Sequence, residues 1–256
     1  MSLVDRVLSQ LVRSNFSEGM SELEYWERFW EGMLRRFDRD GAPLEETNPW
    51  ERGCNLEMVR HYRVLLGGLG GKSILELGSG GGHISALMAK EGARITLVDY
   101  SPLAMEYARR TVRYLDVSER FTLLEGDLLS VQLEQHDVCF NCGVLEHYGD
   151  EHALDILTRM AHLGKDLAAV TVPNLLSPEL LYRMLRYGKG SERFMTPHNL
   201  MALIQRAGLA PMRWLPVNYW TPSFLGAGIA EVARKVNLLR AYWGLAWLFT
   251  CTFRQP

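Results

Sequence analysis

Short apolar runs alternate along the chain with longer segments in which apolar residues recur at helical spacing, an order typical of an α/β fold. The apolar runs predict seven strands, at residues 74–77, 94–98, 121–125, 137–141, 168–173, 212–219 and 246–254. The helical patterns predict helices at residues 56–69, 84–90, 102–115, 151–163, 197–207 and 224–241. Residues 41–53 combine glycine, proline and asparagine and predict a loop.

The first 40 residues are predicted to be helical and to precede the alternation of strands and helices. They carry two apolar stripes, of which the second is rich in aromatic residues: Leu23, Trp26, Phe29, Trp30, Met33, Leu34 and Phe37. Such a stripe is typical of a helical arm packed on the domain. The alternative is a lid in which Tyr25, Trp26 and Trp30 form a wall of the substrate or cofactor pocket.

Composition narrows the range of partners. The net charge of −2 gives no global basic field that would attract nucleic acid. Four cysteines in 256 residues do not make the disulfide framework of a small secreted domain. Asp5 and Arg6 interrupt the apolar region of the amino terminus, and the apolar run around residues 245–251 is far shorter than the ~20 residues of a membrane helix. We expect a cytoplasmic protein without a nucleic acid or membrane partner.

A glycine-rich turn, residues 78–82, joins the first predicted strand to the next helix. Glycines let the backbone bend sharply and let a ligand approach without a Cβ in the way. The helix start that follows offers unpaired N–H groups and a positive dipole end to a polar or anionic ligand. The dinucleotide fingerprint would require a third glycine at the sixth position counted from Gly78, where this chain has His83.

The acid and glycines of this stretch follow a different pattern. Glu76, Gly78, Gly80 and Gly82 match, position by position, motif I of the class I S-adenosylmethionine-dependent methyltransferases, acid-x-Gly-x-Gly-x-Gly. The chain resembles this family over about residues 73–207. The resemblance implies that these four residues and Ser79 bind S-adenosylmethionine, which becomes S-adenosylhomocysteine in the reaction.

The resemblance also implies an architecture. The family fold is a Rossmann-like, seven-stranded, mostly parallel sheet with an antiparallel last strand and helices on both faces. Residues 1–70 would then be an N-terminal helical arm or lid, and residues 71–256 the methyltransferase domain. Insertions at about residues 175–195 and 222–244 would cover the substrate.

An acid at the end of the second predicted strand has the spacing of a ribose ligand. Asp99 lies 21 residues after Gly78, and such an acid can accept hydrogen bonds from both ribose hydroxyls in nucleoside-binding α/β folds. The alternative is that Asp99 is an ordinary acidic residue of a loop and binds no ligand. The family resemblance favours the ribose role and adds the neighbouring Tyr100 to the cofactor site.

Four further cofactor residues follow from the resemblance alone. The Gly-Asp step after the third strand implies that Asp127 and the backbone of Leu128 face the adenine. Asn141 and Cys142, at the end of the fourth strand, would border the methionine part of the cofactor. The Cys139-x-x-Cys142 spacing is interpreted as coincidental, with no metal site, because no second pair supplies ligands.

The segment Val144-Leu145-Glu146-His147 resembles the region after the fourth strand in small-molecule methyltransferases, such as those acting on quinone precursors. His147 is therefore the first candidate for a general base, since an ordinary imidazole accepts a proton near neutrality. Glu146, Tyr148 and His198 are weaker candidates. His147 could instead only shape the pocket or cap the following helix, and a strongly nucleophilic acceptor would need no base.

The sequence thus predicts transfer of a methyl group to an oxygen or nitrogen of a small, partly apolar molecule. Candidate substrate residues are Tyr25, Trp26, Trp30, Tyr148 and His198. The rival hypotheses are a non-catalytic S-adenosylmethionine-binding subunit, a nicotinamide oxidoreductase and an RNA methyltransferase. The last would need a local basic groove, for which Arg35, Arg36 and Arg39 are the densest cluster. A homodimer is left open.

Overall fold

A computed structural model describes residues 20–174, 184–185, 191–193, 195–217 and 246–253. Residues 1–19 of the predicted N-terminal arm lie outside these residues, as do the predicted insertion at 222–244 with its helix at 224–241 and most of the predicted insertion at 175–195. None of the described helices is long and apolar enough to cross a membrane.

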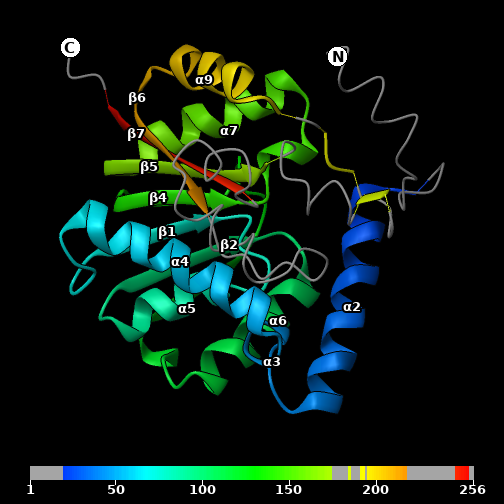
Figure 1. Ribbon diagram of the computed structural model, residues 1–256. Helices are drawn as coiled ribbons and strands as arrows, with labels where there is room; N and C mark the ends of the chain where they lie inside the picture. Colours follow the sequence, from blue (N-terminus) through cyan, green and yellow to red (C-terminus); the bar gives the residue numbers. More distant parts are fainter. Residues whose placement is uncertain (1–19, 175–183, 186–190, 194, 218–245, 254–256) are drawn as a thin grey trace, which may run out of the picture.

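One sheet organises the molecule, with strand order β3-β2-β1-β4-β5-β7-β6 (Figure 1). The strands are β1 Ser73–Leu77, β2 Arg94–Asp99, β3 Phe121–Glu125, β4 His136–Cys142, β5 Gly164–Pro173, β6 Leu209–Val217 and β7 Ala246–Phe253. The pairs from β3 through β5 are parallel, whereas β7 is antiparallel to both β5 and β6. The predicted α/β, Rossmann-like class is confirmed.

Helices cover both faces of the sheet. They are α2 Glu22–Asp40, α3 Leu44–Thr47, α4 Pro49–Leu66, α5 His83–Lys90, α6 Pro102–Tyr114, α7 Asp150–Leu163 and α9 Pro197–Arg206. Helices α4, α5 and α6 lie on one face, and α7 and α9 on the other (Figure 1). Short 3-10 turns, η1 Ser118–Arg120 and η2 Leu145–His147, complete the connections.

The core consists of two apolar layers, one on each side of the sheet. Because side chains alternate along a strand, neighbouring residues enter different layers. Ile74 and Val138 pack in the layer under α4, α5 and α6, whereas Leu75 and Cys139 pack with α7 and α9. This alternation later decides which side chains at the end of β4 face the pocket.

Two helices begin where they are predicted to begin and have capping side chains. Ser101 Oγ accepts a hydrogen bond from Ala104 N at 3.1 Å, and Thr196 Oγ1 accepts one from Asn199 N at 3.2 Å. A proline follows each cap at the first position of its helix. The starts of α6 and α9 are therefore confirmed.

The loop predicted for residues 41–53 is wrong over most of its length. The segment forms α3 and the first turn of α4, and Arg52 N donates to Asn48 O at 3.0 Å. Asn48 and Pro49 act here as a helix start, since proline suits the first helical position and its missing N–H costs nothing there. Strand β5 also begins four residues earlier than predicted, because Gly164 follows α7 directly.

The described part of the N-terminal arm packs along α6. Glu27 Oε1 accepts a hydrogen bond from Ser101 Oγ at 2.5 Å, and Arg110 Nη1 lies 2.5 Å from Asp38 Oδ1. Between these polar contacts, the Trp30 and Tyr107 rings have centroids 5.4 Å apart. These contacts hold α2 beside the loop that follows β2.

Candidate active site

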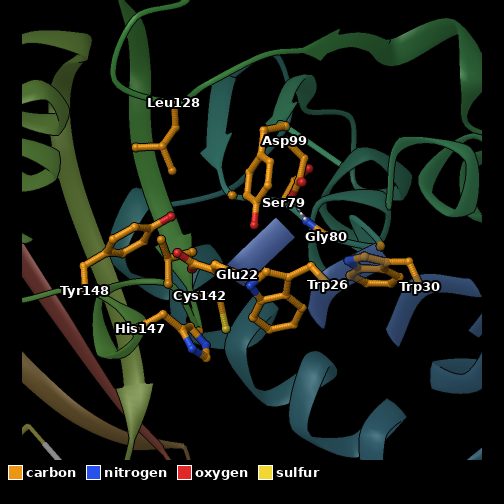
Figure 2. A pocket seen from close by; sticks show the side chains of 15 residues that line it. Glu22, Trp26, Trp30, Ser79, Gly80, Asp99, Leu128, Cys142, His147 and Tyr148 are labelled. Atoms are coloured by element: carbon orange, nitrogen blue, oxygen red, sulfur yellow. Dashed lines mark hydrogen bonds between the residues drawn. The ribbon is translucent and has the colours of Figure 1, made fainter. Parts of the chain in front are cut away.

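The loops after β1, β2, β3 and β4 meet at one edge of the sheet, where parallel strands end together, and with residues of α2 they line a pocket (Figure 2). The lining residues are Glu22, Trp26, Trp30, Gly78, Ser79, Gly80, Gly81, Asp99, Tyr100, Leu128, Cys142, Gly143, Val144, His147 and Tyr148. Strand ends in an open α/β sheet are the usual place for a ligand.

The glycine turn has a backbone that other residues would not adopt. Gly78 and Gly80 have φ angles of 69° and 50°, in the left-handed region. A Cβ on Gly78 would lie 2.7 Å from Val144 Cγ2, and one on Gly80 would lie 2.7 Å from Trp30 Cζ2. The turn therefore needs glycine both for its conformation and for the close approach of its neighbours.

Asp99 ends β2 at the inner wall of the pocket. Its Oδ2 accepts a hydrogen bond from Gly80 N at 2.8 Å, and its Oδ1 accepts one from Ser101 N at 2.9 Å. Burial raises the pKa of this carboxyl, and the backbone donors partly oppose that shift. Each carboxylate oxygen keeps further acceptor capacity, so the side chain can still bind hydroxyl groups of a ligand.

The pocket also holds polar atoms that lack a partner. Within the described part of the chain, the buried hydroxyls of Ser79 and Tyr100 have no hydrogen-bond partner. Burial raises the pKa of Tyr100, which keeps its hydroxyl neutral. Two unpaired hydroxyls, an acid and a glycine cradle in one pocket fit a polar ligand such as a nucleoside.

Asp127 lies beside this pocket. An adjoining cavity is lined by Asp127 and Leu129, and it shares Tyr100, Leu128 and Tyr148 with the main pocket. Asp127 Oδ1 accepts a hydrogen bond from Leu129 N at 2.8 Å, which fixes the carboxylate at the start of this loop. The adenine position predicted for Asp127 and Leu128 thus falls at the junction of two cavities.

His147, which ends η2, lies opposite the glycine turn. Its Nδ1 lies 2.7 Å from Ser191 Oγ, and its ring meets the edge of Trp26 with centroids 5.0 Å apart. Burial lowers the pKa of His147, so the neutral imidazole dominates near pH 7. The next residue, Tyr148, also lines the pocket, and burial raises its pKa to about 12.

Besides Asp127, five residues predicted for the site do not line the main pocket: Glu76, Gly82, Asn141, Tyr25 and His198. Glu76 is buried beneath the turn, where Ser85 Oγ donates to its Oε2 at 2.5 Å and burial raises its pKa to about 8. Gly82 caps α5 with a φ of 63°. Tyr25 contacts Trp26 edge-on, and His198 is exposed on α9.

Asn141 and Cys142 show how strand alternation sorts neighbouring residues. The Asn141 amide donates to Met160 Sδ at 3.2 Å, inside the layer that contains α7. Cys142 points the other way and lines the pocket, with its thiol 3.9 Å from Met58 Sδ. Glu146, the weaker base candidate, is buried outside the pocket, and burial raises its pKa to about 8.

Four lining residues were not predicted from the sequence: Glu22, Gly81, Gly143 and Val144. For Glu22 a signal existed, since Glu22, Trp26 and Trp30 are spaced by four and lie on one face of α2. For Val144 the signal is its contact with Gly78, which depends on the fold and is invisible in the sequence.

The fold and site together define an α/β protein whose pocket combines a glycine turn and a buried acid at the strand ends with aromatic side chains of α2. Residues 74–166 match the family described as "Methyltransferase domain". The ubiquinone biosynthesis O-methyltransferase of Bordetella avium (strain 197N) is 27% identical over 239 residues, covering 86% of this chain and 93% of that protein. The ubiquinone biosynthesis O-methyltransferase of Ruegeria sp. (strain TM1040) is 31% identical over 158 residues, covering 56% and 62%.

A solved structure supports the fold over nearly the whole chain. The magnesium protoporphyrin IX methyltransferase of Synechocystis PCC 6803, solved with bound S-adenosylhomocysteine, aligns with a TM-score of 0.62 at 16% identity, covering 90% of this chain and 97% of that one. A second solved structure of that Synechocystis enzyme contains bound S-adenosylmethionine. Residues 74–166 are a methyltransferase domain, and the fold of the chain is that of class I S-adenosylmethionine-dependent methyltransferases.

Proposed function

We propose that this enzyme transfers a methyl group to an oxygen or nitrogen of a small, partly apolar molecule. The main observation is that the aromatic side chains of Trp26, Trp30 and Tyr148 line the same pocket as the glycine turn and Asp99. Such a pocket suits a compact apolar acceptor held close to the cofactor. The names of the two relatives and of the solved structure, which refer to ubiquinone biosynthesis and magnesium protoporphyrin IX, support an acceptor of this kind.

We infer that the cofactor is S-adenosylmethionine and that it lies along the inner wall of the pocket. Asp99 would accept hydrogen bonds from the ribose hydroxyls, and the backbone around Gly78, Ser79 and Gly80 would border the methionine part. Asp127 and Leu128 would hold the adenine where the two cavities meet. Asn141 would not contact the cofactor and would only support the end of β4, because its amide donates a hydrogen bond to Met160 Sδ.

S-adenosylmethionine supplies a methyl group already activated by its attachment to a sulfonium. The chain therefore has to align the acceptor and exclude water more than it has to activate the methyl group. We infer that His147 accepts the proton of the acceptor. Burial favours its neutral form, and in the tautomer whose Nδ1–H donates to Ser191 Oγ the unprotonated Nε2 would be the base.

We further propose that residues 1–70 form an arm that acts as a lid over residues 71–256. The packing of α2 along α6 and the presence of Trp26 and Trp30 at the pocket support this role. The insertions at about 175–195 and 222–244 would complete the substrate cover. We also propose that the protein is cytoplasmic and forms a homodimer.

An acceptor screen tests the proposed substrate class. Release of S-adenosylhomocysteine is measured with S-adenosylmethionine and one candidate at a time: catechol, a long-chain alkylphenol, an aromatic amine, and total RNA. Turnover of a phenol, catechol or amine but not of RNA is expected. Turnover of RNA alone would establish the rival RNA methyltransferase instead, and tight cofactor binding without turnover of any acceptor would favour a non-catalytic subunit.

A further inference from the structure

Helix α2 presents a carboxyl group to the pocket at its amino-terminal end. Glu22 is the first residue of the helix, whose start is capped by Ser21 Oγ accepting a hydrogen bond from Glu24 N at 3.1 Å. Figure 2 shows the Glu22 side chain reaching into the pocket beside Trp26. The carboxyl is therefore placed by a regular, capped helix rather than by a loose end of the chain.

Two other residues on the same face of α2 fix the position of Glu22. Trp30, two turns further on, is buried against Gly80 and the Tyr107 ring. Trp26, between them, contacts the His147 ring and donates its indole N–H to the Glu22 carboxyl. A rigid helix anchored at Trp30 thus determines where the acid lies.

The charges around the pocket are one-sided. Among the lining residues that the structure describes, the carboxyl groups are Glu22 and Asp99, and no lysine or arginine accompanies them. Asp99 is held by the backbone N–H groups of Gly80 and Ser101. Glu22 has no ion-pair partner within the described ranges, and its neighbours include the hydroxyl groups of Tyr100 and Tyr148.

A half-buried carboxylate without a cation is poorly solvated, and burial accordingly raises the pKa of Glu22. A positive centre entering the pocket would restore the lost electrostatic stabilisation. The indole face of Trp26 adds to this preference, since aromatic rings attract cations. A neutral group of the same shape would gain neither contribution.

We propose that Glu22, together with Trp26, makes this pocket select a positively charged sulfonium over the neutral thioether of the spent cofactor. The inference rests on the proposed cofactor position, because the sulfur is joined through one carbon to the ribose that Asp99 would hold. Methyl transfer removes the positive charge from sulfur, so the same acid that favours the incoming cofactor would favour release of the product.

Three ligands that differ at one position test this charge preference. S-adenosylmethionine carries a sulfonium there, S-adenosylhomocysteine a neutral thioether, and sinefungin an amine that is protonated at pH 7. Their dissociation constants are measured by calorimetry for the full chain, for Glu22→Gln and for Glu24→Gln. Glu24 is the matched control, because it lies in the same first turn and is exposed in an ion pair with Arg28.

The wild type should bind the two cationic ligands about tenfold or more tightly than S-adenosylhomocysteine, the effect of one attraction between opposite charges in a partly buried site. Glu22→Gln should lose most of this ratio while its affinity for S-adenosylhomocysteine stays the same, and Glu24→Gln should keep it. Circular dichroism on heating establishes that both variants fold.

An unchanged ratio in Glu22→Gln would overturn the inference and leave the proposed function intact. Equal affinity of the wild type for all three ligands would do the same. Failure of the wild type to bind any of them would instead overturn the proposed cofactor position, and the inference with it.

Discussion

At the scale of single residues, Asp99 links three parts of the site. It ends β2, it holds the turn through Gly80 N, and it holds the start of α6 through Ser101 N. The spacing from Gly78 was enough to predict this residue, since strand length and turn length fix where the acid falls. The two backbone donors could not be predicted, because they depend on how the turn folds back over β2.

Replacing Asp99 with alanine should weaken binding of S-adenosylhomocysteine at least tenfold, about 1.4 kcal/mol, because charge-assisted hydrogen bonds to the ribose are lost. Calorimetric titration measures the change. Glu125→Ala is the matched control, since Glu125 is paired with Asp99 at the end of β3 but is exposed and outside the pocket. Equal affinity of both variants would remove Asp99 from the cofactor site.

Replacing His147 with alanine should lower turnover of an acceptor found in the screen by about 10²-fold or more, the usual contribution of a general base, while cofactor affinity is retained. His198→Ala, on the exposed face of α9, should leave turnover unchanged.

The pH profile gives a second test of His147. A base must be deprotonated, so the wild-type rate should fall as the pH drops through the pKa of His147, which burial places below the ordinary value of ~6.5. A rate that keeps the same pH dependence in His147→Ala would show that another group, or none, accepts the proton.

At the scale of elements, the regular alternation of apolar runs and amphipathic segments was sufficient for β1 to β5, α5, α6 and α7. It failed at residues 41–53, where asparagine and proline begin a helix. It also could not show which helix faces the pocket, because an aromatic stripe has the same spacing whether it packs on a domain or lines a cavity.

His83, the residue that departs from the dinucleotide fingerprint, connects helices α3 and α4 to the glycine turn. The ring is buried, with Nε2 3.0 Å from Glu46 Oε1 and Nδ1 3.0 Å from Asn55 Nδ2. Because the Asn55 amide nitrogen can only donate, Nδ1 accepts and Nε2 donates to Glu46. His83 thus links both helices to the first residue of α5.

His83→Ala should destabilise the protein by about 1–3 kcal/mol, since it leaves a buried amide and a carboxylate unpaired. It should also weaken cofactor binding, because the turn before α5 loses its support. Urea unfolding and titration with S-adenosylhomocysteine measure the two effects, and His162→Ala, exposed on α7, is the control. Unchanged stability would show that the contacts of His83 contribute nothing net.

At the scale of the whole molecule, the sheet brings segments separated by more than 100 residues to one pocket. The glycine turn, Asp99 and the segment after β4 could be predicted to meet, because parallel strands end on the same edge. The contribution of Glu22 could not, since it requires α2 to lie across that edge. Asn141 faces away from the pocket because it lies two residues after Cys139 in β4 and therefore on the same side of the sheet, opposite to Cys142. Strand alternation alone predicts that Asn141 and Cys142 cannot both face the pocket.

We propose that this pocket binds the adenosyl cofactor of methyl transfer and not a nicotinamide. Calorimetric titration of the full chain with S-adenosylhomocysteine, and separately with NADH, distinguishes the two ligands. We expect a dissociation constant in the micromolar range for S-adenosylhomocysteine, roughly −8 kcal/mol, and no heat of binding with NADH. Binding of NADH without binding of S-adenosylhomocysteine would contradict it.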